Sequence, residues 1–156
     1  MVSCIFEDGN KANLRHVVVD AIIIKDKSIL MVKRAAKLLE GGKWGLVGGY
    51  LDKDETLVEG LKREVMEETG YELKTVNFFT ILDAWDRKGE DRQNIAMIYI
   101  CSPGKKKGEH DWESTEVKWF DLDNLPLEEE IAFDHLKTIN LYLNNRNFNP
   151  INLLKY

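Results

Sequence analysis

The stretch GYLDKDETLVEGLKREVMEETGY, residues 49–71, is the part of the sequence that decides the fold. Within it, Thr56 is a plausible helix N-cap, and Glu59 three residues later completes a capping-box pattern. Gly70 is the residue type that most often ends a helix in the left-handed conformation. These signals predict a helix over residues 57–69.

The predicted helix carries three acids on neighbouring positions. Glu64 and Glu68 fall beside or within its apolar stripe, and Glu64 lies three residues from Glu67 and four from Glu68, so the three carboxylates repel one another. Glu67 and Glu68 also lie in the last turn, where the helix dipole favours cations. A solvated acidic face is the simpler interpretation, but a bound divalent cation would reverse both penalties. The pattern therefore predicts a site for Mg²⁺, with Mn²⁺ as a possible substitute.

Neighbouring residues strengthen this interpretation. Gly48 and Gly49 permit a tight backbone turn just before the helix, with a carbonyl that can face the acids. Glu55 and Arg63 can form an ion pair that fixes how the loop approaches the helix. Loop and helix are therefore expected to form one site.

The rest of the chain is predicted to consist mainly of strands. β-Branched residues dominate residues 16–25 and the pattern resumes at residues 28–34, which predicts a hairpin. Apolar residues recur at helical spacing over residues 127–144, which predicts a closing helix. Further strands are expected over residues 44–47, 75–85, 94–101 and 116–120, with a turn-rich segment at 102–108. These elements predict an α/β fold with a mixed β-sheet between helices.

Composition limits the other possibilities. The chain has 156 residues, 44% hydrophobic and 31% charged, which suits a single domain over residues 1–156. A net charge of −5 argues against nucleic acid as the main partner. The sequence shows no span long enough to cross a membrane, no secretory pattern and no C-x-x-C pair. We therefore expect a cytoplasmic protein without a membrane partner, and a homodimer stays open.

Residues 49–71 resemble the Nudix box, the signature of the Nudix hydrolase family. The resemblance rests on Gly49, Glu55, Arg63, Glu64, Glu67, Glu68 and Gly70. Flanking segments at 31–34, 42–46 and 116–126 extend it over residues 16–143. Val47 departs from the usual proline before the two glycines, and Tyr71 from a usual aliphatic residue. Neither position is a carboxylate, so the metal site is expected to be intact.

The resemblance implies an α/β/α sandwich and a magnesium-dependent enzyme. Such an enzyme would cleave the pyrophosphate linkage of a small nucleoside diphosphate derivative, with ADP-ribose or a related sugar nucleotide as the preferred substrate. A nucleoside triphosphate pyrophosphohydrolase that cleans the nucleotide pool is the alternative, and dinucleoside polyphosphates come third. A non-catalytic sensor or nucleotide-binding module is less favoured, because none of the acids of the box is lost.

The resemblance also implies roles for individual residues. Metal binding falls to Glu64, Glu67 and Glu68 with the Gly49 carbonyl, and Arg63 orients the glutamates. Gly48 and Glu55 have supporting roles. The general base is either a glutamate of the box or a later acid, for which the candidates are Asp111, Glu113 and Glu116. Among these we prefer Glu113, although a solvated loop residue is an equally good interpretation of it.

Substrate contacts are expected outside the box. Trp85 and Trp112 lie near strand ends among charged neighbours, where a large ring can stack on a base. The charged turn at 86–92 can present arginines to phosphate or ribose, or is simply a solvated hairpin loop. His135, on the predicted closing helix, is expected to have a packing role only. The predicted substrate-binding residues are Arg34, Tyr50, Trp85, Arg87, Arg92 and Trp112.

Overall fold

The computed structural model describes residues 2–85 and 93–145. Arg87 and Arg92 therefore lie outside the described residues. A short 3₁₀ turn at Glu128–Glu130 precedes the second helix. The helices and strands are β1 (Val2–Ile5), β2 (Lys11–Leu14), β3 (Val17–Lys25), β4 (Ser28–Arg34), β5 (Trp44–Gly45), β6 (Val47–Tyr50), α1 (Leu57–Thr69), β7 (Tyr71–Leu82), β8 (Ile95–Lys106), β9 (Ser114–Asp121) and α2 (His135–Asn144).

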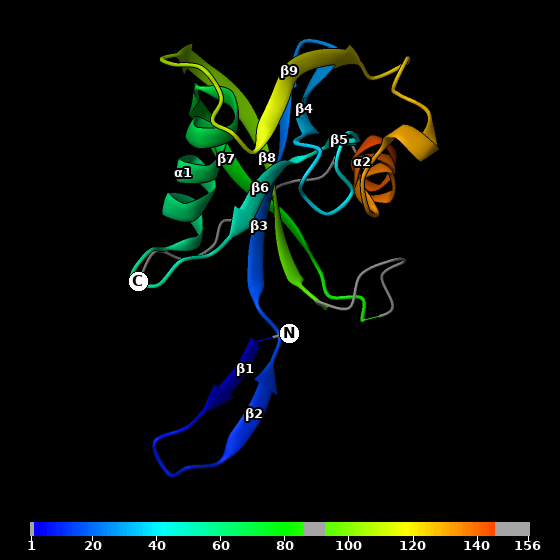
Figure 1. The fold of residues 1–156 in the computed structure, drawn as a ribbon. Coiled ribbons are helices and arrows are strands. Elements are labelled where there is room, and N and C mark those ends of the chain that lie inside the picture. The colour runs from blue at the N-terminus through cyan, green and yellow to red at the C-terminus, as the bar shows by residue number, and fades with distance from the viewer. Residues whose placement is uncertain (1, 86–92, 146–156) are drawn as a thin grey trace.

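A mixed sheet lies between the two helices, as the sequence predicts (Figure 1). Within the described residues, seven strands form this sheet: five follow the order β5-β4-β3-β8-β7, β6 pairs with β3, and β9 pairs with β4. β3 and β8 are parallel, whereas the other pairs are antiparallel. The chain therefore has the α/β class and the layered arrangement that the sequence predicts.

A fork between β3 and β4 positions the functional site. The two strands pair with each other only near their hairpin turn, from Ile23 to Lys25 on β3. Farther along, β6 pairs with β3 and β5 pairs with β4, so the β5–β6 segment fills the gap between the diverging strands. Gly48 and Gly49 lie on β6, opposite Asp20 and Val19. The fork therefore brings the glycine pair to the middle of the sheet.

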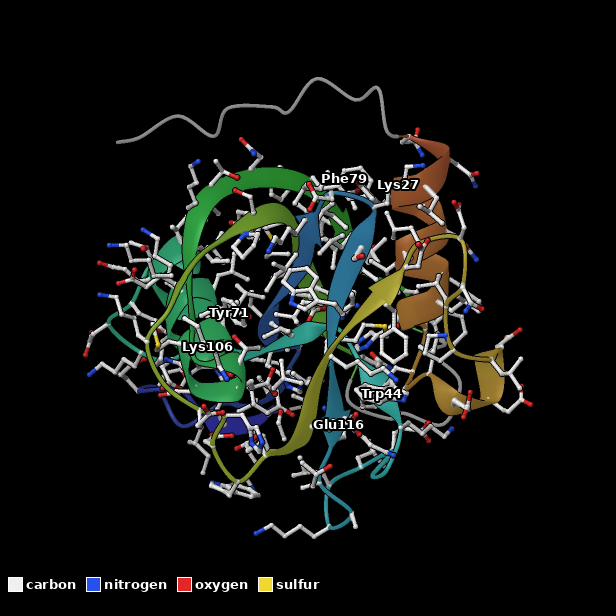
Figure 2. All side chains as sticks on the ribbon, turned by 90° about the horizontal axis from the view of Figure 1, so that it is seen from above. Lys27, Trp44, Tyr71, Phe79, Lys106 and Glu116 are labelled. Carbon is white, nitrogen blue, oxygen red and sulfur yellow. The ribbon has the colours of Figure 1, made fainter. Side chains whose placement is uncertain are left out.

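β3 supplies side chains to both layers of the core. Val18 and Ile22 pack in the cluster on the α2 side, together with Trp44 of β5. Val19 and Ala21 pack in the cluster on the α1 side, which Tyr71 borders. Viewed from above, Trp44 and Tyr71 lie on the two sides of the sheet (Figure 2). The alternation explains why this strand is almost continuously apolar, since both of its faces are covered.

The bounds of α1 agree with the predicted 57–69, because local signals set both ends. The Thr56 side chain accepts a hydrogen bond from the Glu59 N–H, and the Glu59 carboxylate accepts one from the Thr56 N–H. Gly70 adopts φ 71° and its N–H bonds to the Met66 carbonyl. A Cβ at Gly70 would collide with the Gly108 carbonyl, so glycine is required for space as well as for conformation.

The prediction of a closing helix over 127–144 is wrong for its first eight residues. Phe133 has a φ of 55°, which a helix cannot accommodate. Residues 131 and 132 are extended instead, because the Ala132 N–H donates to the Trp44 carbonyl at 2.8 Å and Ile131 forms a bridge with Trp44. Pairing with β5 therefore overrides the helical spacing, and α2 starts at His135.

The predicted turn at 102–108 is also mostly wrong. β8 continues to Lys106, which pairs with Tyr71 at the start of β7. The pairing is irregular around Leu73, which lies opposite Pro103. Pairing with the long strand β7 therefore keeps Pro103 and Gly104 within β8, although both residue types locally favour a turn. The strand expected from residue 75 begins at residue 71.

Residues 2–14 form an element that the sequence patterns do not predict. β1 and β2 make a two-stranded antiparallel sheet of their own, which extends away from the main sheet (Figure 1). Large apolar side chains on this hairpin are exposed, among them Val2, Ile5 and Phe6. In the described part of the chain, no helix is long and apolar enough to span a membrane.

Candidate active site

A cavity of about 360 Å³ opens where β6, the C-terminal half of α1 and the start of α2 come together. Its α1 wall is acidic and includes Glu64, Glu67 and Glu68. The residues before α2 form the facing wall with Arg34, and Asp111 and Glu113 reach it from the loop before β9. The three predicted metal-binding glutamates therefore lie in one cavity.

Arg63 ties the acids of the α1 wall together. Its guanidinium makes five hydrogen bonds, as many as it has N–H groups. Two go to Glu55, from Nη2 at 2.8 Å and Nε at 3.1 Å, and Nη2 also reaches the Tyr50 carbonyl at 3.0 Å. Nη1 donates to Glu64 at 2.8 Å and to Glu67 at 3.1 Å. The predicted ion pair with Glu55 is present, and it lowers the pKa of that carboxyl.

Glu68 is the most buried acid of the site, with 5% of its surface exposed. Its Oε2 accepts a hydrogen bond from the Gly48 N–H at 3.0 Å. Burial raises the pKa of Glu68 to about 8, because desolvation of the charged carboxylate outweighs the bond from Gly48. The metal-free site therefore holds a carboxyl group that ionises only at a cost.

The Glu64 carboxylate lies directly against the backbone of Gly49. A Cβ at position 49 would come within 2.5 Å of the Glu64 Cδ, so a larger residue would displace the carboxylate. Burial raises the pKa of Glu64, and the hydrogen bond from Arg63 opposes this shift. The second glycine of the pair is thus needed for the close approach of an acid to the strand.

The donor set of this cavity fits a hard divalent cation, because carboxylate oxygens are the ligands that Mg²⁺ prefers. As their side chains stand, no three His, Cys, Asp or Glu residues in the described ranges 2–85 and 93–145 are placed to hold a metal ion. The contacts above give the reason: Arg63 binds Glu64 and Glu67, while Gly48 binds Glu68. The glutamate carboxylates of the box are thus engaged with Arg63 and Gly48 in this structure.

The loop before β9 brings two of the three candidate bases to the cavity. The Asp111 N–H donates to the Glu67 carbonyl at the end of α1, at 2.8 Å, and the Asp111 side chain accepts from the Glu113 N–H at 2.9 Å. Glu113 lines the cavity, and its charge contributes to the raised pKa values of Glu64 and Glu68. Glu116 lies on β9, opposite Lys33, and does not line the cavity.

The predicted substrate-binding residues divide into two groups. Arg34 and Tyr50 line the cavity. Trp85 and Trp112 do not line it; they are 71% and 57% exposed, and the Lys37 ammonium lies 3.8 Å from the Trp112 ring centroid. Their exposure agrees with the sequence argument, but the structure places neither ring in the cavity.

Comparison with known proteins identifies the family. The family model of the NUDIX domain matches residues 14–142. The chain belongs to the Nudix hydrolase family. An ADP-ribose pyrophosphatase of Methanocaldococcus jannaschii is 34% identical over 133 residues, which cover 84% of this chain and 75% of that protein. A MutT-like protein of Streptomyces ambofaciens is 29% identical over 119 residues, covering 76% of this chain and 72% of the relative.

Solved Nudix structures share the fold. A MutT Nudix hydrolase from Burkholderia pseudomallei superposes with a TM-score of 0.71 at 25% identity, covering 82% of this chain and 98% of that one. The Nudix domain of Shewanella oneidensis NrtR, solved with ADP-ribose, gives a TM-score of 0.73 at 23% identity, covering 88% and 91%. The protein is therefore a Nudix-type hydrolase that acts on nucleotide derivatives, in a family that generally uses divalent metal ions.

Two residues of this Nudix hydrolase were missed on the wall opposite the box. His135 was expected only to pack; it is buried, but it also lines the cavity, and its Nδ1 accepts the Leu46 N–H at 2.9 Å. Phe133 lines the same wall, with the Arg34 guanidinium 5.0 Å from its ring centroid. The sequence did not indicate that these residues line the cavity, because the predicted helix over 127–144 placed both of them in a packed helix.

Two more cavity residues come from the main sheet. Asp20 is buried on β3, and Asn94 is buried just before β8. Asp20 had a sequence signal, since it is a charged residue inside the apolar run VVVDAIII. Asn94 had none, because an asparagine before a strand is ordinary turn chemistry.

Proposed function

We propose that this Nudix hydrolase cleaves ADP-ribose with Mg²⁺ bound by Glu64, Glu67 and Glu68. The observation that carries the proposal is the convergence of these acids on one cavity, where Arg63 organises two of them. The similarity to the ADP-ribose pyrophosphatase of M. jannaschii supports the choice of substrate. Mn²⁺ is expected to substitute for Mg²⁺, because both accept carboxylate oxygens.

A pyrophosphate group repels an attacking nucleophile through its negative charge. A bound divalent cation would neutralise phosphate oxygens and lower the pKa of the attacking water. Arg63 has a positioning role in this scheme: through its bonds to Glu55 and the Tyr50 carbonyl it fixes the loop against α1. Gly48 holds Glu68 through its N–H, and Gly49 leaves room for Glu64. These contacts hold the carboxylates that would bind the ion within one cavity.

Glu113 is our candidate for the general base. It shares the cavity with the glutamates of the box, and the Ala35 N–H donates to its carbonyl at 2.8 Å, which anchors the loop. In the proposed reaction a Glu113 carboxylate oxygen takes a proton from water as the water oxygen bonds to one phosphorus. The bond between that phosphorus and the bridging oxygen breaks. ADP-ribose and water then give AMP and ribose 5-phosphate.

Arg34 and Tyr50 are proposed to contact the parts of the substrate beyond the scissile bond. Arg34 lines the cavity and its charge acts on Glu68, so it lies within electrostatic reach of a phosphate there. Tyr50 follows Gly49 directly and also lines the cavity. The described residues give no cavity contact for Trp85 or Trp112, so these two stay outside the proposal.

A substrate screen with product analysis tests the proposal. Purified enzyme with Mg²⁺ is given ADP-ribose, other sugar nucleotides and nucleoside triphosphates, and the products are separated by chromatography. AMP and ribose 5-phosphate are expected from ADP-ribose, whereas triphosphates would release pyrophosphate. A kcat/KM for triphosphates at least about tenfold above that for ADP-ribose, or about 1.4 kcal/mol in transition-state binding, would overturn the choice of substrate.

A further inference from the structure

The chain crosses from one strand pairing to another at Leu46, between β5 and β6. Gly45 pairs with Val32 of β4. Val47 pairs with Ala21 of β3, and within residues 2–85 Leu46 itself is paired with neither strand. Leu46 is 3% exposed, and a buried backbone N–H is costly to leave without an acceptor. An acceptor from outside the sheet is therefore needed at the point where the chain crosses the fork.

His135 supplies this acceptor. Its Nδ1 accepts the Leu46 N–H at 2.9 Å, and the residue is 6% exposed. An imidazole nitrogen that accepts a hydrogen bond carries no proton of its own, so the bond fixes both the orientation of the ring and the state of Nδ1. Gly45 leaves room for this contact, because a Cβ at position 45 would lie 3.3 Å from the His135 Nδ1. The first residue of α2 is thus fitted closely against the strand crossing.

A second bond holds the chain on the other side of Gly45. The Ala132 N–H donates to the Trp44 carbonyl at 2.8 Å, and Ile131 forms a bridge with Trp44. Residues 131–135 therefore hold the chain both before and after Gly45. The bond to Trp44 joins two backbones, whereas the bond to residue 46 uses a side chain. Only the second of these bonds can therefore be removed by changing one side chain.

The contacts of the glycine pair depend on where Leu46 lies. Gly48, two residues farther along the chain, donates its N–H to the Glu68 Oε2 at 3.0 Å. Gly49 lies so close to Glu64 that a Cβ on it would come within 2.5 Å of the carboxylate carbon. Two residues of extended chain span only about 7 Å, so a shift of Leu46 is passed on to both glycines. Moving Leu46 is therefore expected to move the glycines relative to both acids.

We propose that His135 is a positioning residue for the metal-binding acids. By holding Leu46 it sets where the glycine pair lies against Glu64 and Glu68, and it acts through the backbone of residues 46–49. The inference rests on the proposed function, because it requires these acids to bind the ion. Groups that orient metal ligands typically contribute about 10- to 100-fold to metal affinity. A loss of metal affinity is therefore the expected sign of this role.

The test measures Mn²⁺ binding to the substrate-free protein by isothermal titration calorimetry, after treatment with EDTA and dialysis. His135→Asn places an acceptor oxygen near the position of Nδ1, whereas the longer side chain of His135→Gln places its amide near that of Nε2. We expect His135→Gln to raise the Kd for Mn²⁺ about tenfold or more, and His135→Asn to stay within about threefold of wild type. Thr138→Ala changes a buried residue of the same helix without removing the bond to Leu46, and it should bind Mn²⁺ as wild type does.

Two results would overturn the role of His135. One is a folded His135→Gln protein with the wild-type Kd. The other is an equal loss of affinity in His135→Asn and His135→Gln, because ring volume rather than the bond to Leu46 would then be responsible. If His135→Gln does not fold, as judged by circular dichroism, Gly45→Ala replaces it, since its Cβ would press on the imidazole. A Kd in Gly45→Ala equal to that of wild type would then overturn the role.

A failure of the proposed function gives a different result. If wild type binds no Mn²⁺, the proposed metal site is wrong, and amide hydrogen exchange in the metal-free protein tests His135 separately. The Gly48 N–H should exchange at least about tenfold faster in His135→Gln than in wild type or His135→Asn. Equal rates in the three proteins would overturn the positioning role. A preference for triphosphates over ADP-ribose would leave both measurements unchanged, because neither uses a substrate.

Discussion

The two walls of the cavity are built from different chemistry. The α1 wall consists of carboxylates, two of which Arg63 binds, and burial raises the pKa values of Glu64 and Glu68. The wall before α2 consists of the Phe133 ring beneath Arg34 and of the His135 ring, whose Nδ1 accepts the Leu46 N–H. The difference suggests a division of labour, in which the first wall acts on the reacting phosphates and the second holds the rest of the substrate.

The largest expected effect is on kcat, when Glu67 or Glu68 of the α1 wall is replaced by glutamine. In the proposed metal-bound site, each change would remove one carboxylate charge and one oxygen ligand at nearly constant volume. We expect kcat to fall at least about a thousandfold, or about 4 kcal/mol, with a small change in KM. Steady-state kinetics with saturating Mg²⁺ measures this.

Glu72→Gln, on the exposed part of β7, is the matched control for these two variants and should retain wild-type rates. Near-normal turnover in either the Glu67 or the Glu68 variant would remove that residue from the proposed metal site. The pair Glu113→Gln and Glu116→Gln separates the two later acids, because only Glu113 lines the cavity.

Added Mg²⁺ should stabilise the folded protein, because the ion would offset the repulsion among the glutamates. Binding to the folded state alone contributes about 2.7 kcal/mol at a concentration one hundred times the Kd. We expect a rise in Tm by differential scanning fluorimetry after EDTA treatment, and a much smaller rise in a Glu64→Gln/Glu68→Gln double variant. Equal shifts in the two proteins would mean that the ion binds elsewhere.

Phe133→Ala probes the second wall and should have the opposite kinetic signature. In the proposed division between the walls, the ring contacts the substrate equally in the ground state and the transition state, so its removal should raise KM about tenfold while kcat stays within about twofold. Leu127→Ala, an exposed apolar residue earlier in the same segment, is the control. A loss confined to kcat would show that this wall takes part in the chemical step. It would contradict the proposal that the two walls have separate roles.

A further effect is expected on the stability of the metal-free protein. Because burial raises the pKa of Glu68 to about 8, the folded state holds this proton while the unfolded chain releases it near pH 4.5. Stability from this group therefore falls as pH rises from about 4.5 to 8, and Glu68→Gln should escape the loss. In EDTA, urea unfolding should show the variant gaining about 3–4 kcal/mol over wild type between pH 5 and 8. A constant difference across this range would contradict the burial argument.

The two helices show what could be predicted of the fold. The ends of α1 are set by Thr56, Glu59 and Gly70. Each bonds to a residue three or four positions away, so a local sequence pattern can reveal both ends. The start of α2 depends on the bonds between residues 131–132 and Trp44, almost ninety residues earlier. A local sequence pattern gives no information about so distant a partner. Helical spacing alone therefore predicted a start for this helix that is too early.

The candidate site divides in the same way. The acids, Arg63 and the glycine pair were found because they lie together in sequence and break local rules of charge and helix dipole. Phe133 and His135 reach the cavity from around the start of α2, and Asn94 from just before β8, and each looks ordinary in its own segment. The fork between β3 and β4 helps to bring these residues together. The fork depends on how the β5–β6 segment pairs with the two strands, which a local sequence pattern does not show.

The alternation along β3 has a consequence for how this strand can change in evolution. Asp20 and Val18 face the cavity side, while Val19 and Ala21 face α1. Inserting or deleting one residue near position 18 would exchange the two faces, placing the Asp20 carboxylate among the apolar contacts of α1. Substitutions can accumulate on either face separately, but a change in the length of this strand would disrupt the core and the cavity at once.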